Sequence, residues 1–330
     1  MTAIILGTNV TILTTIMLFV FAGSLLYAAG ELLVSGLSRL SRFFRIDEFV
    51  VAFIVMAFAA TVPNFFVGIT SALQGVPELS YGDVMGNNMV ALTLAVALAV
   101  IFSPKKELPL ENRTVRDSAL LTPIAALLPL VLIVDGTLSR TDGIVLILFF
   151  VIYVIWLFSR KERFSKVYDL KLTSLPTDDK KSALISMIKV VVGIVMLAVT
   201  AQLVVHASVL IAQLLNVPLM VIGVLVVGLG GALPELYFTF VSARKGETSM
   251  LLGNLMGAVI IPATLVLGIV ALIHPIQNEN LELPLVGRIF LAIIALLFLY
   301  FSRTQQSISK YEGYFLLFAY AAFVAMLLLL

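Results

Sequence analysis

Residues 230–235 read GGALPE, and residues 253–258, on the next apolar segment, read GNLMGA. The stretches 171 positions earlier, residues 59–64 and 82–87, read AATVPN and GDVMGN. The proline of the first motif and both glycines of the second therefore recur at one fixed spacing, without a gap. Glycine and proline punctuate helices, so such matches arise by chance between apolar sequences far less readily than matched leucines do. We therefore interpret the chain as an internal repeat.

The same offset aligns further residues on either side of these motifs: Ser71 with Ser242, Ala72 with Ala243, Gly75 with Gly246, Thr93 with Thr264, Leu32 with Leu203 and Val34 with Val205. The repeat divides the chain into a first half, residues 1–160, and a second half, residues 183–330. A polar and charged linker, residues 161–182, separates them.

The composition predicts that most of the protein surface lies in lipid. Hydrophobic residues make up 61% of the 330 residues and charged residues only 12%, with a mean hydropathy of +1.12. A soluble domain keeps roughly a quarter of its residues charged. Apolar runs of about 20 residues match the hydrocarbon layer of a bilayer. We therefore expect an all-α polytopic protein whose main partner is the lipid bilayer.

The absence of cysteine and the small net charge exclude further kinds of site and partner. The chain has no cysteine, which rules out disulfides and thiolate metal sites, and its two histidines cannot make a zinc cluster alone. The net charge is +2 and the basic residues lie between apolar segments, so we expect no nucleic-acid partner.

Ten apolar segments can be read as membrane crossings. They are Thr11–Leu37, Val50–Leu73, Tyr81–Phe102, Ser118–Val134, Ile144–Phe158, Ala183–Leu215, Val217–Ala243, Met250–Ile273, Leu283–Phe301 and Tyr311–Leu330. Each half holds five of them. Because five is an odd number, the second half enters the membrane in the opposite orientation, and inverted repeats of this kind are typical of secondary transporters.

The basic residues orient these segments. With ten crossings, all 21 Lys and Arg residues except Arg140 and Arg288 fall on one side of the membrane. The positive-inside rule makes that side cytoplasmic. We therefore expect both termini outside the cytoplasm and, since no targeting segment is evident, a location in the plasma membrane of a prokaryote.

Prolines interrupt the second and seventh predicted helices at equivalent positions, Pro63 and Pro234. A proline inside a helix removes one hydrogen bond to the carbonyl four residues earlier, which here belongs to Ala59 or Gly230. Free carbonyl oxygens of this kind are ligands for hard cations.

Polar side chains gather around these prolines. Asn64 and Glu235 each follow a proline directly, and a carboxylate inside a membrane span marks a functional cavity unless it is paired or protonated. Glu235 is the strongest candidate ligand. The other candidate ligands, on the third and eighth predicted helices and before Pro63, are Asp83, Asn87, Asn88, Asn254 and Thr61.

Each of these residues also has a structural interpretation. Asp83 lies near the start of its apolar segment, where interfacial water could solvate it. Glu31 either supports the fold or lines an ion path, and we favour the first. The hydroxyls of Thr61, Thr93 and Thr264 are most simply bonded back to their own helices. For the four motif glycines, Gly82, Gly86, Gly253 and Gly257, we favour helix packing.

The paired motifs resemble the repeats of the cation/calcium exchanger superfamily, which includes sodium/calcium and proton/calcium exchangers. Each repeat of that family reads close to GTSLPE, followed by GNxxGSN. Residues 230–235 and 253–259 match the second repeat in part, and residues 59–64 and 82–88 match the first more loosely.

The resemblance covers the whole chain in its architecture, and it implies a secondary active cation antiporter rather than an enzyme. It further implies alternating access by sliding of the first and sixth helices, with ions bound between helices two, three, seven and eight. No cofactor is implied, because Ca²⁺, Na⁺, K⁺ or H⁺ would be transported cargo.

The sequence also departs from the family pattern. The paired acidic residues of the family fall on Asn64 and Glu235, so one carboxylate is replaced by an amide. With Glu235 alone, a dehydrated Ca²⁺ would leave one positive charge uncompensated in a low-dielectric site. Two hypotheses follow: a site for one monovalent cation or proton, or a divalent site completed by Asp83.

Other function classes remain as alternatives. A membrane-embedded enzyme would need a nucleophile with its base, or paired aspartates, within the bilayer, and the sequence contains no such set. A channel would not require inverted symmetry. Two alternatives remain. One is a transporter of an organic solute, which Phe65, Phe66 and Tyr237 near the prolines are compatible with. The other is a family member without transport activity.

Overall fold

The structure is a computed structural model of the whole chain. It describes residues 2–43, 61–104, 107–110, 113–159, 180–246, 248–277, 282–303 and 307–329. Part of the second predicted span, the alanine at position 59 and most of the linker lie outside these residues. The described residues are almost all helical, as the composition predicted.

The elements follow the predicted repeat. The first half contains α1 (Thr2–Phe43), α3 (Val62–Leu73), α4 (Pro77–Val90), η2 (Ala91–Ala95), α5 (Val96–Phe102), β1 (Glu107–Pro109), α6 (Arg113–Leu132), η3 (Ile133–Asp135), β2 (Thr137–Leu138) and α7 (Arg140–Ser159). The second half contains α8 (Lys180–Leu215), α9 (Leu219–Ile222), η6 (Gly223–Val227), α10 (Gly228–Lys245), α11 (Thr248–Ile261), η7 (Pro262–Val266), α12 (Leu267–Ile273), β3 (Ile276–Gln277), α13 (Glu282–Arg303), β4 (Ser307–Ser309) and α14 (Lys310–Leu329).

The helices are long and apolar enough to confirm a polytopic membrane protein. Eight helices within the described residues meet the length and hydropathy required to cross a bilayer, for example Leu251–Ile273. The other two expected crossings correspond to α14, which has 20 residues, and to α3, a 12-residue apolar helix that follows undescribed residues. The ten-helix arrangement predicted from the sequence is thus the observed one.

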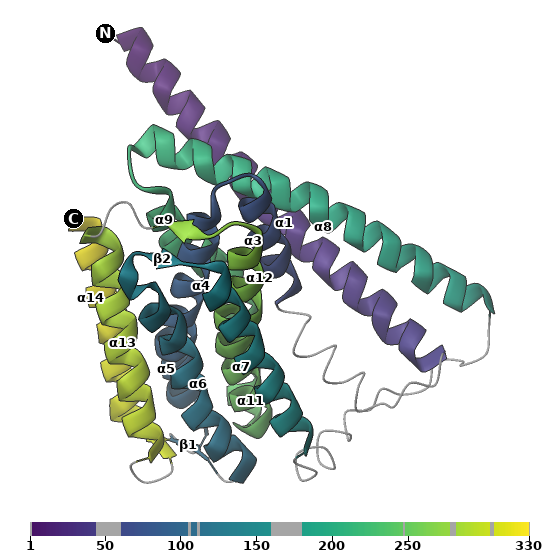
Figure 1. Cartoon of the computed structure of the whole chain (residues 1–330), viewed down its shortest axis with the longest axis vertical. Coiled ribbons are helices and arrows are strands. Elements are labelled where there is room, and N and C mark those ends of the chain that lie inside the picture. Colours follow the sequence, from purple (N-terminus) through teal and green to yellow (C-terminus); the bar gives the residue numbers. More distant parts are fainter. Residues whose placement is uncertain are drawn as a thin grey trace.

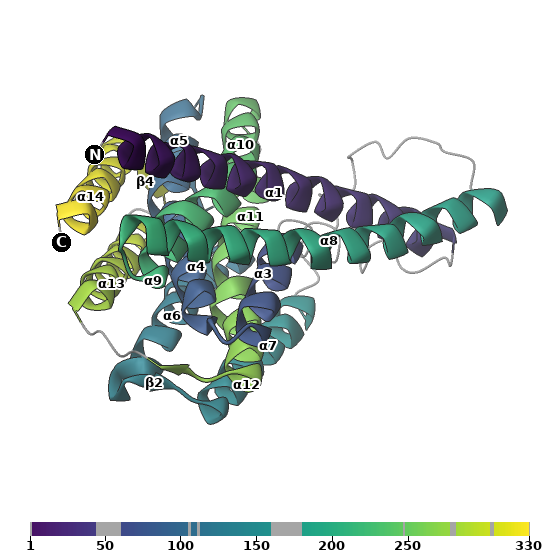
Figure 2. The same ribbon diagram turned by 90° about the horizontal axis from the view of Figure 1, so that it is seen from above.

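Two long helices lie across the rest of the molecule. α1 and α8 run side by side in opposite directions over a bundle formed by the other helices (Figures 1 and 2). Small residues allow them to approach, since a Cβ on Gly193 would lie 2.9 Å from the backbone nitrogen of Leu33, and one on Gly36 would lie 2.9 Å from the carbonyl oxygen of Ser186. These contacts between α1 and α8 use small residues in the way that membrane helices pack.

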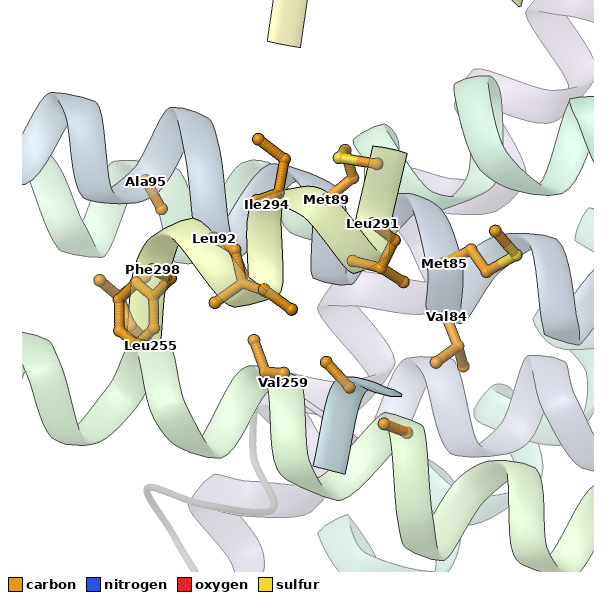
Figure 3. Packing of buried hydrophobic residues seen from close by; sticks show 14 of the residues in the cluster. Val84, Met85, Met89, Leu92, Ala95, Leu255, Val259, Leu291, Ile294 and Phe298 are labelled. Carbon is orange, nitrogen blue, oxygen red and sulfur yellow. The ribbon is translucent and has the colours of Figure 1, made fainter. Parts of the chain in front are cut away.

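The bundle is held by a continuous apolar core. Side chains from α4, η2, α11 and α13 interdigitate there (Figure 3), among them Met89, Leu92, Val259, Leu291 and Phe298, which are each at most 2% exposed. Both halves contribute to this core, so it joins the repeats rather than filling each one separately.

Short strands also connect the two halves, a feature that the sequence analysis did not predict. β1 of the first half pairs antiparallel with β4 of the second, and β2 of the first pairs antiparallel with β3 of the second. The two strand pairs lie at opposite ends of the bundle (Figure 1). The operation that exchanges the halves therefore also exchanges the two strand pairs, as an inverted repeat requires.

Helix irregularities obey the same symmetry. A π-helical segment occupies Ala91–Ala95 in the first half and Pro262–Val266 in the second, which are 171 residues apart at both ends. Thr93 donates a hydrogen bond to the Met89 carbonyl (2.5 Å) and Thr264 donates one to the Ile260 carbonyl (2.6 Å). The prediction that these two hydroxyls bond back to their own helices is confirmed. π-Helical turns are often found at functional sites.

The tightest contact between the halves is made by backbone alone. α4 lies against η6 and the start of α10 with no side chain between them, because a Cβ on Gly86 would overlap the carbonyl group of Val224. In return, a Cβ on Gly228 would lie 2.8 Å from the carbonyl oxygen of Asp83. Packing is thus the observed role of Gly82 and Gly86. Nothing in the described part of the chain lies within 4 Å of an added Cβ on Gly253 or Gly257, so packing is not observed for those two.

We expect Gly86→Ala to destabilise the protein, because the added methyl group would force α4 away from the backbone of Val224. Overpacking of this kind typically costs about 1–3 kcal/mol. Thermal unfolding in detergent should show a melting temperature several degrees below that of the wild type. Gly23→Ala is the matched control, since no described atom lies within 4 Å of the added carbon. Equal melting temperatures for the two variants would contradict the proposed contact.

Candidate ion-binding site

A cavity of about 890 Å³ lies where α1, α3, α10 and α11 meet. Its walls include Pro63 and Asn64 from α3, Gly230 and Glu235 from α10, and Asn254 from α11. Four of the nine candidate ligands predicted from the sequence are thus brought to one cavity by elements of both halves.

Glu235 lies on the wall of this cavity and is only 5% exposed. Its Oε2 atom has no hydrogen-bond partner among the described residues. The preceding Pro234 lies inside α10 and has no N–H to donate to the Gly230 carbonyl, and the space beside the Gly230 Cα is open. Glu235 and Gly230 therefore line the same cavity. That the Gly230 carbonyl is free to bind a cation stays a prediction from the proline motif.

Asn64 is the repeat equivalent of Glu235 and lies across from it. It is 5% exposed, and the glycine at 231 lets it approach α10, since a Cβ there would lie 3.0 Å from the Asn64 Oδ1. In the described residues, Pro63 belongs to the first turn of α3. The residues before Thr61 are not described, so the interruption of a helix at Pro63 stays a prediction.

Asp83 is buried deep in the protein, so the alternative in which water at a helix end solvates it is not observed. It is 1% exposed, and neither carboxylate oxygen has a hydrogen-bond partner among the described residues. The reason is that α4 begins at Pro77 rather than near Tyr81, so Asp83 lies in the second turn of the helix. Asp83 does not line the cavity, but it is close enough to act electrostatically on Glu235.

The two halves contribute polar groups in a crossed pattern. Asn64 and Glu235 are repeat equivalents, and so are Asp83 and Asn254. Each half therefore supplies one carboxylate and one amide to the region, but at different positions of the motif. Side-chain amides of this kind offer a carbonyl oxygen to a hard cation.

Asn87 links the halves at their symmetry axis. Its Nδ2 donates a hydrogen bond of 2.9 Å to the carbonyl of Ala258, which is its own repeat equivalent, while its Oδ1 is buried without a partner. Asn88 is also buried with an unpartnered Oδ1, but it does not line the cavity. Of these two predicted ligands, the structure thus places Asn87 between the halves and Asn88 away from the cavity wall.

The remaining candidates before Pro63 are placed only in part. Thr61 is buried, and its carbonyl accepts a hydrogen bond of 2.9 Å from the Phe65 N–H. Ala59 lies outside the described residues, so the predicted free carbonyl in the first half has no described counterpart to that of Gly230.

Two buried hydroxyl groups near the carboxylates were not among the predicted ligands. Thr239 lies one helical turn after Glu235 and Ser80 lies three residues before Asp83, and both are 0% exposed with hydroxyl oxygens that lack a partner in the described part of the chain. Residues three or four apart lie on the same face of a helix. The distance of Thr239 from Glu235 and of Ser80 from Asp83 along the sequence could therefore have identified both hydroxyls.

The described residues contain no cluster of three His, Asp or Glu side chains that could hold a metal ion. A cation in this region would therefore be bound by at most two carboxylates, with amide, hydroxyl and backbone carbonyl oxygens completing its coordination. Such mixed oxygen sets are usual for Ca²⁺, which takes six to eight ligands at about 2.3–2.6 Å.

Comparisons with known proteins agree with this architecture. The profile of the family described as sodium/calcium exchanger protein matches residues 14–159 and 185–329. An uncharacterized membrane protein of Methanocaldococcus jannaschii is 26% identical over 92% of this chain and 94% of its own length. The sodium/calcium exchanger MaX1 of Methanosarcina acetivorans is 24% identical over 92% of this chain and 95% of its own length.

Solved structures give the same result. A structure of the sodium-calcium exchanger NCX_Mj, soaked with 100 mM Na⁺ and 10 mM Sr²⁺, matches with a TM-score of 0.60 and 25% sequence identity. The match covers 95% of this chain and 98% of that one.

We expect the cavity to be filled with water. Because the chain has no cysteine, a single introduced thiol reports on its own position. Ser24→Cys, on the cavity wall, should react with a charged, water-soluble thiol reagent in proteoliposomes. Ile152→Cys, at a position 66% exposed on the outside of α7, should not react, because lipid surrounds it. Labelling of neither thiol, or of both equally, would contradict a hydrated cavity.

Proposed function

Because the chain belongs to the sodium/calcium exchanger protein family, we propose that it is a secondary cation antiporter that exchanges Ca²⁺ for Na⁺. The observation that supports this proposal is the pair of buried carboxylates, Asp83 and Glu235: both oxygens of Asp83 and the Oε2 of Glu235 lack protein partners in the described chain. One comes from each half, so the site depends on both repeats.

Charge balance at the two carboxylates favours one divalent cation or two monovalent cations. Two ionised carboxylates in a low-dielectric region repel each other, and unpaired buried charges are costly. One Ca²⁺ compensates both charges, and two Na⁺ ions compensate them equally well. A site that is neutralised in turn by one Ca²⁺ and by two Na⁺ ions is suited to exchange. If one kind of ion left and the other did not replace it, the two buried carboxylates would be uncompensated, which is costly.

The neighbouring oxygens would complete the coordination. The amide oxygens of Asn64 and Asn254, the Oδ1 of Asn87 and the carbonyl of Gly230 lie on the elements that surround the carboxylates. They carry no charge, so they add ligands without changing the balance set by Asp83 and Glu235. We propose these residues, with Thr61 and Asn88 as more distant candidates, as the ion-binding set.

The orientation in the membrane follows from the charges at the two ends of the bundle. Arg244 and Lys245 end α10, and Arg303 and Lys310 lie beside β4, at the end where β1 pairs with β4. We assign this end to the cytoplasm. α1 begins and α14 ends toward the other face (Figure 1), so both termini would be outside the cytoplasm. Relatives from archaea and bacteria support a prokaryotic plasma membrane.

Transport by the purified protein in proteoliposomes tests the proposal. We expect Ca²⁺ uptake that requires an outward Na⁺ gradient, and loss of at least about 90% of this uptake in Glu235→Gln and in Asp83→Asn, because one carboxylate cannot compensate a divalent ion. Glu107→Gln, which removes an exposed carboxylate on β1, is the matched control and should transport at the wild-type rate.

The pattern of results separates the hypotheses. Wild-type rates in Glu235→Gln would contradict the proposed site. Absence of Ca²⁺ uptake by the wild-type protein, with gradient-driven Na⁺ or K⁺ flux that depends on Glu235, would show that the fold is kept while the site selects monovalent cations.

A further inference from the structure

One wall of the 890 Å³ cavity is lined by polar side chains of α1 that the ion-binding set does not include. Ser24, Tyr27, Glu31 and Ser35 all line the cavity, and their spacing of three, four and four residues places them on one face of the helix. The rest of this part of α1 is apolar and crosses the membrane between residues 13 and 33. A polar stripe in such a helix requires water or an ion beside it.

Glu31 is the charged member of this stripe. It is exposed to the cavity, and its Oε1 accepts a hydrogen bond of 2.8 Å from the Tyr27 hydroxyl. The bond fixes the carboxylate against α1 and leaves Oε2 available. The hydroxyls of Ser24 and Ser35 donate to the backbone carbonyls of Val20 and Leu32, so their oxygen lone pairs also stay available.

The carboxylate of Glu31 shares its cavity with Glu235 on the opposite wall. Glu235 is 5% exposed and has an unpartnered oxygen, so it forms the deep end of the cavity, while Glu31 forms an exposed part. Tyr27 lies within electrostatic range of both carboxylates. A cation that enters this cavity and binds Glu235 would therefore share the cavity with the stripe on α1.

The second half of the chain lacks this charge. The repeat equivalents of Tyr27, Glu31 and Ser35 on α8 are Ala198, Gln202 and His206. In an inverted repeat, equivalent stretches of α1 and α8 lie toward opposite faces of the membrane. The charged stripe therefore serves only one of the two faces.

We infer that Glu31 and Tyr27 form a second cation-binding site in this cavity, where a partly hydrated Ca²⁺ is held before it reaches the central carboxylates. The inference rests on the proposed function, because it names the site through which the same cation enters. Glu31 binds the ion through Oε2, and Tyr27 is a positioning residue that holds the carboxylate toward the cavity. The site raises the local concentration of divalent cations at one face of the protein and not at the other.

Transport kinetics test the role of this site. In Glu31→Gln, the apparent KM for Ca²⁺ should rise about fivefold when Ca²⁺ is added at one face of oriented proteoliposomes, with the maximal rate and the KM at the other face unchanged. High salt should reduce the difference from the wild type, because screening weakens the attraction. Glu107→Gln is again the control. An unchanged KM at both faces, or an equal loss of maximal rate at both, would overturn the inference.

Direct binding provides a readout that does not depend on transport. Tb³⁺ is a Ca²⁺ substitute whose luminescence is excited by a nearby tyrosine, and Tyr27 is in hydrogen-bond contact with Glu31. In the Glu235→Gln background, which removes one central carboxylate, Tb³⁺ luminescence should persist and should fall when either Glu31→Gln or Tyr27→Phe is added. Luminescence that is unaffected by both additions would overturn the second site, whatever the transport assay shows for the central one.

Discussion

The close approach of α4 to η6 and α10 is the contact on which the rest of the structure depends. Glycines at 82, 86, 223 and 228 bring the two backbones together without intervening side chains. Asp83 belongs to one of these helices and Glu235 to the other, so their separation is set by backbone packing rather than by flexible side chains. A pair of like charges held in this way cannot relax by moving apart, and a cation is the natural means of compensating them.

Asymmetry within a symmetric scaffold defines the chemistry of the site. The π-helical segments of Ala91–Ala95 and Pro262–Val266 repeat at an offset of 171 residues, and the two strand pairs correspond to one another, but the side chains at equivalent positions differ. Carboxylate and amide have exchanged places between the motifs, and the Asn87 side chain bonds to the backbone of Ala258 where a second asparagine would restore the symmetry. The scaffold thus keeps the polar positions of the motifs while the sequence decides which of them carry charge.

Much of this fold could be predicted from the sequence, because long apolar segments and repeated glycines and prolines leave a clear pattern. The features that could not be predicted are those without such a pattern. A π-helical segment leaves no trace in hydropathy, and strands of two or three residues are too short to show alternation. The burial of Asp83 was missed because the apolar segment begins near Tyr81, whereas Pro77 starts the helix one turn earlier. For Glu31 the sequence left open whether it supports the fold or lines an ion path, since spacing along α1 does not reveal which elements lie opposite.

The strand pairs have a consequence for how such a chain could arise and assemble. β1 has its partner in β4 and β2 has its partner in β3, so each strand in the described part of the chain is completed by the other half. Gly143 of α7 likewise packs against Gly268 of α12, across the same boundary. A polypeptide of half this length would leave all of these edges open, and it could close them only against a second copy inserted upside down. The two repeats therefore complete one another, and joining them in a single chain supplies both in equal numbers.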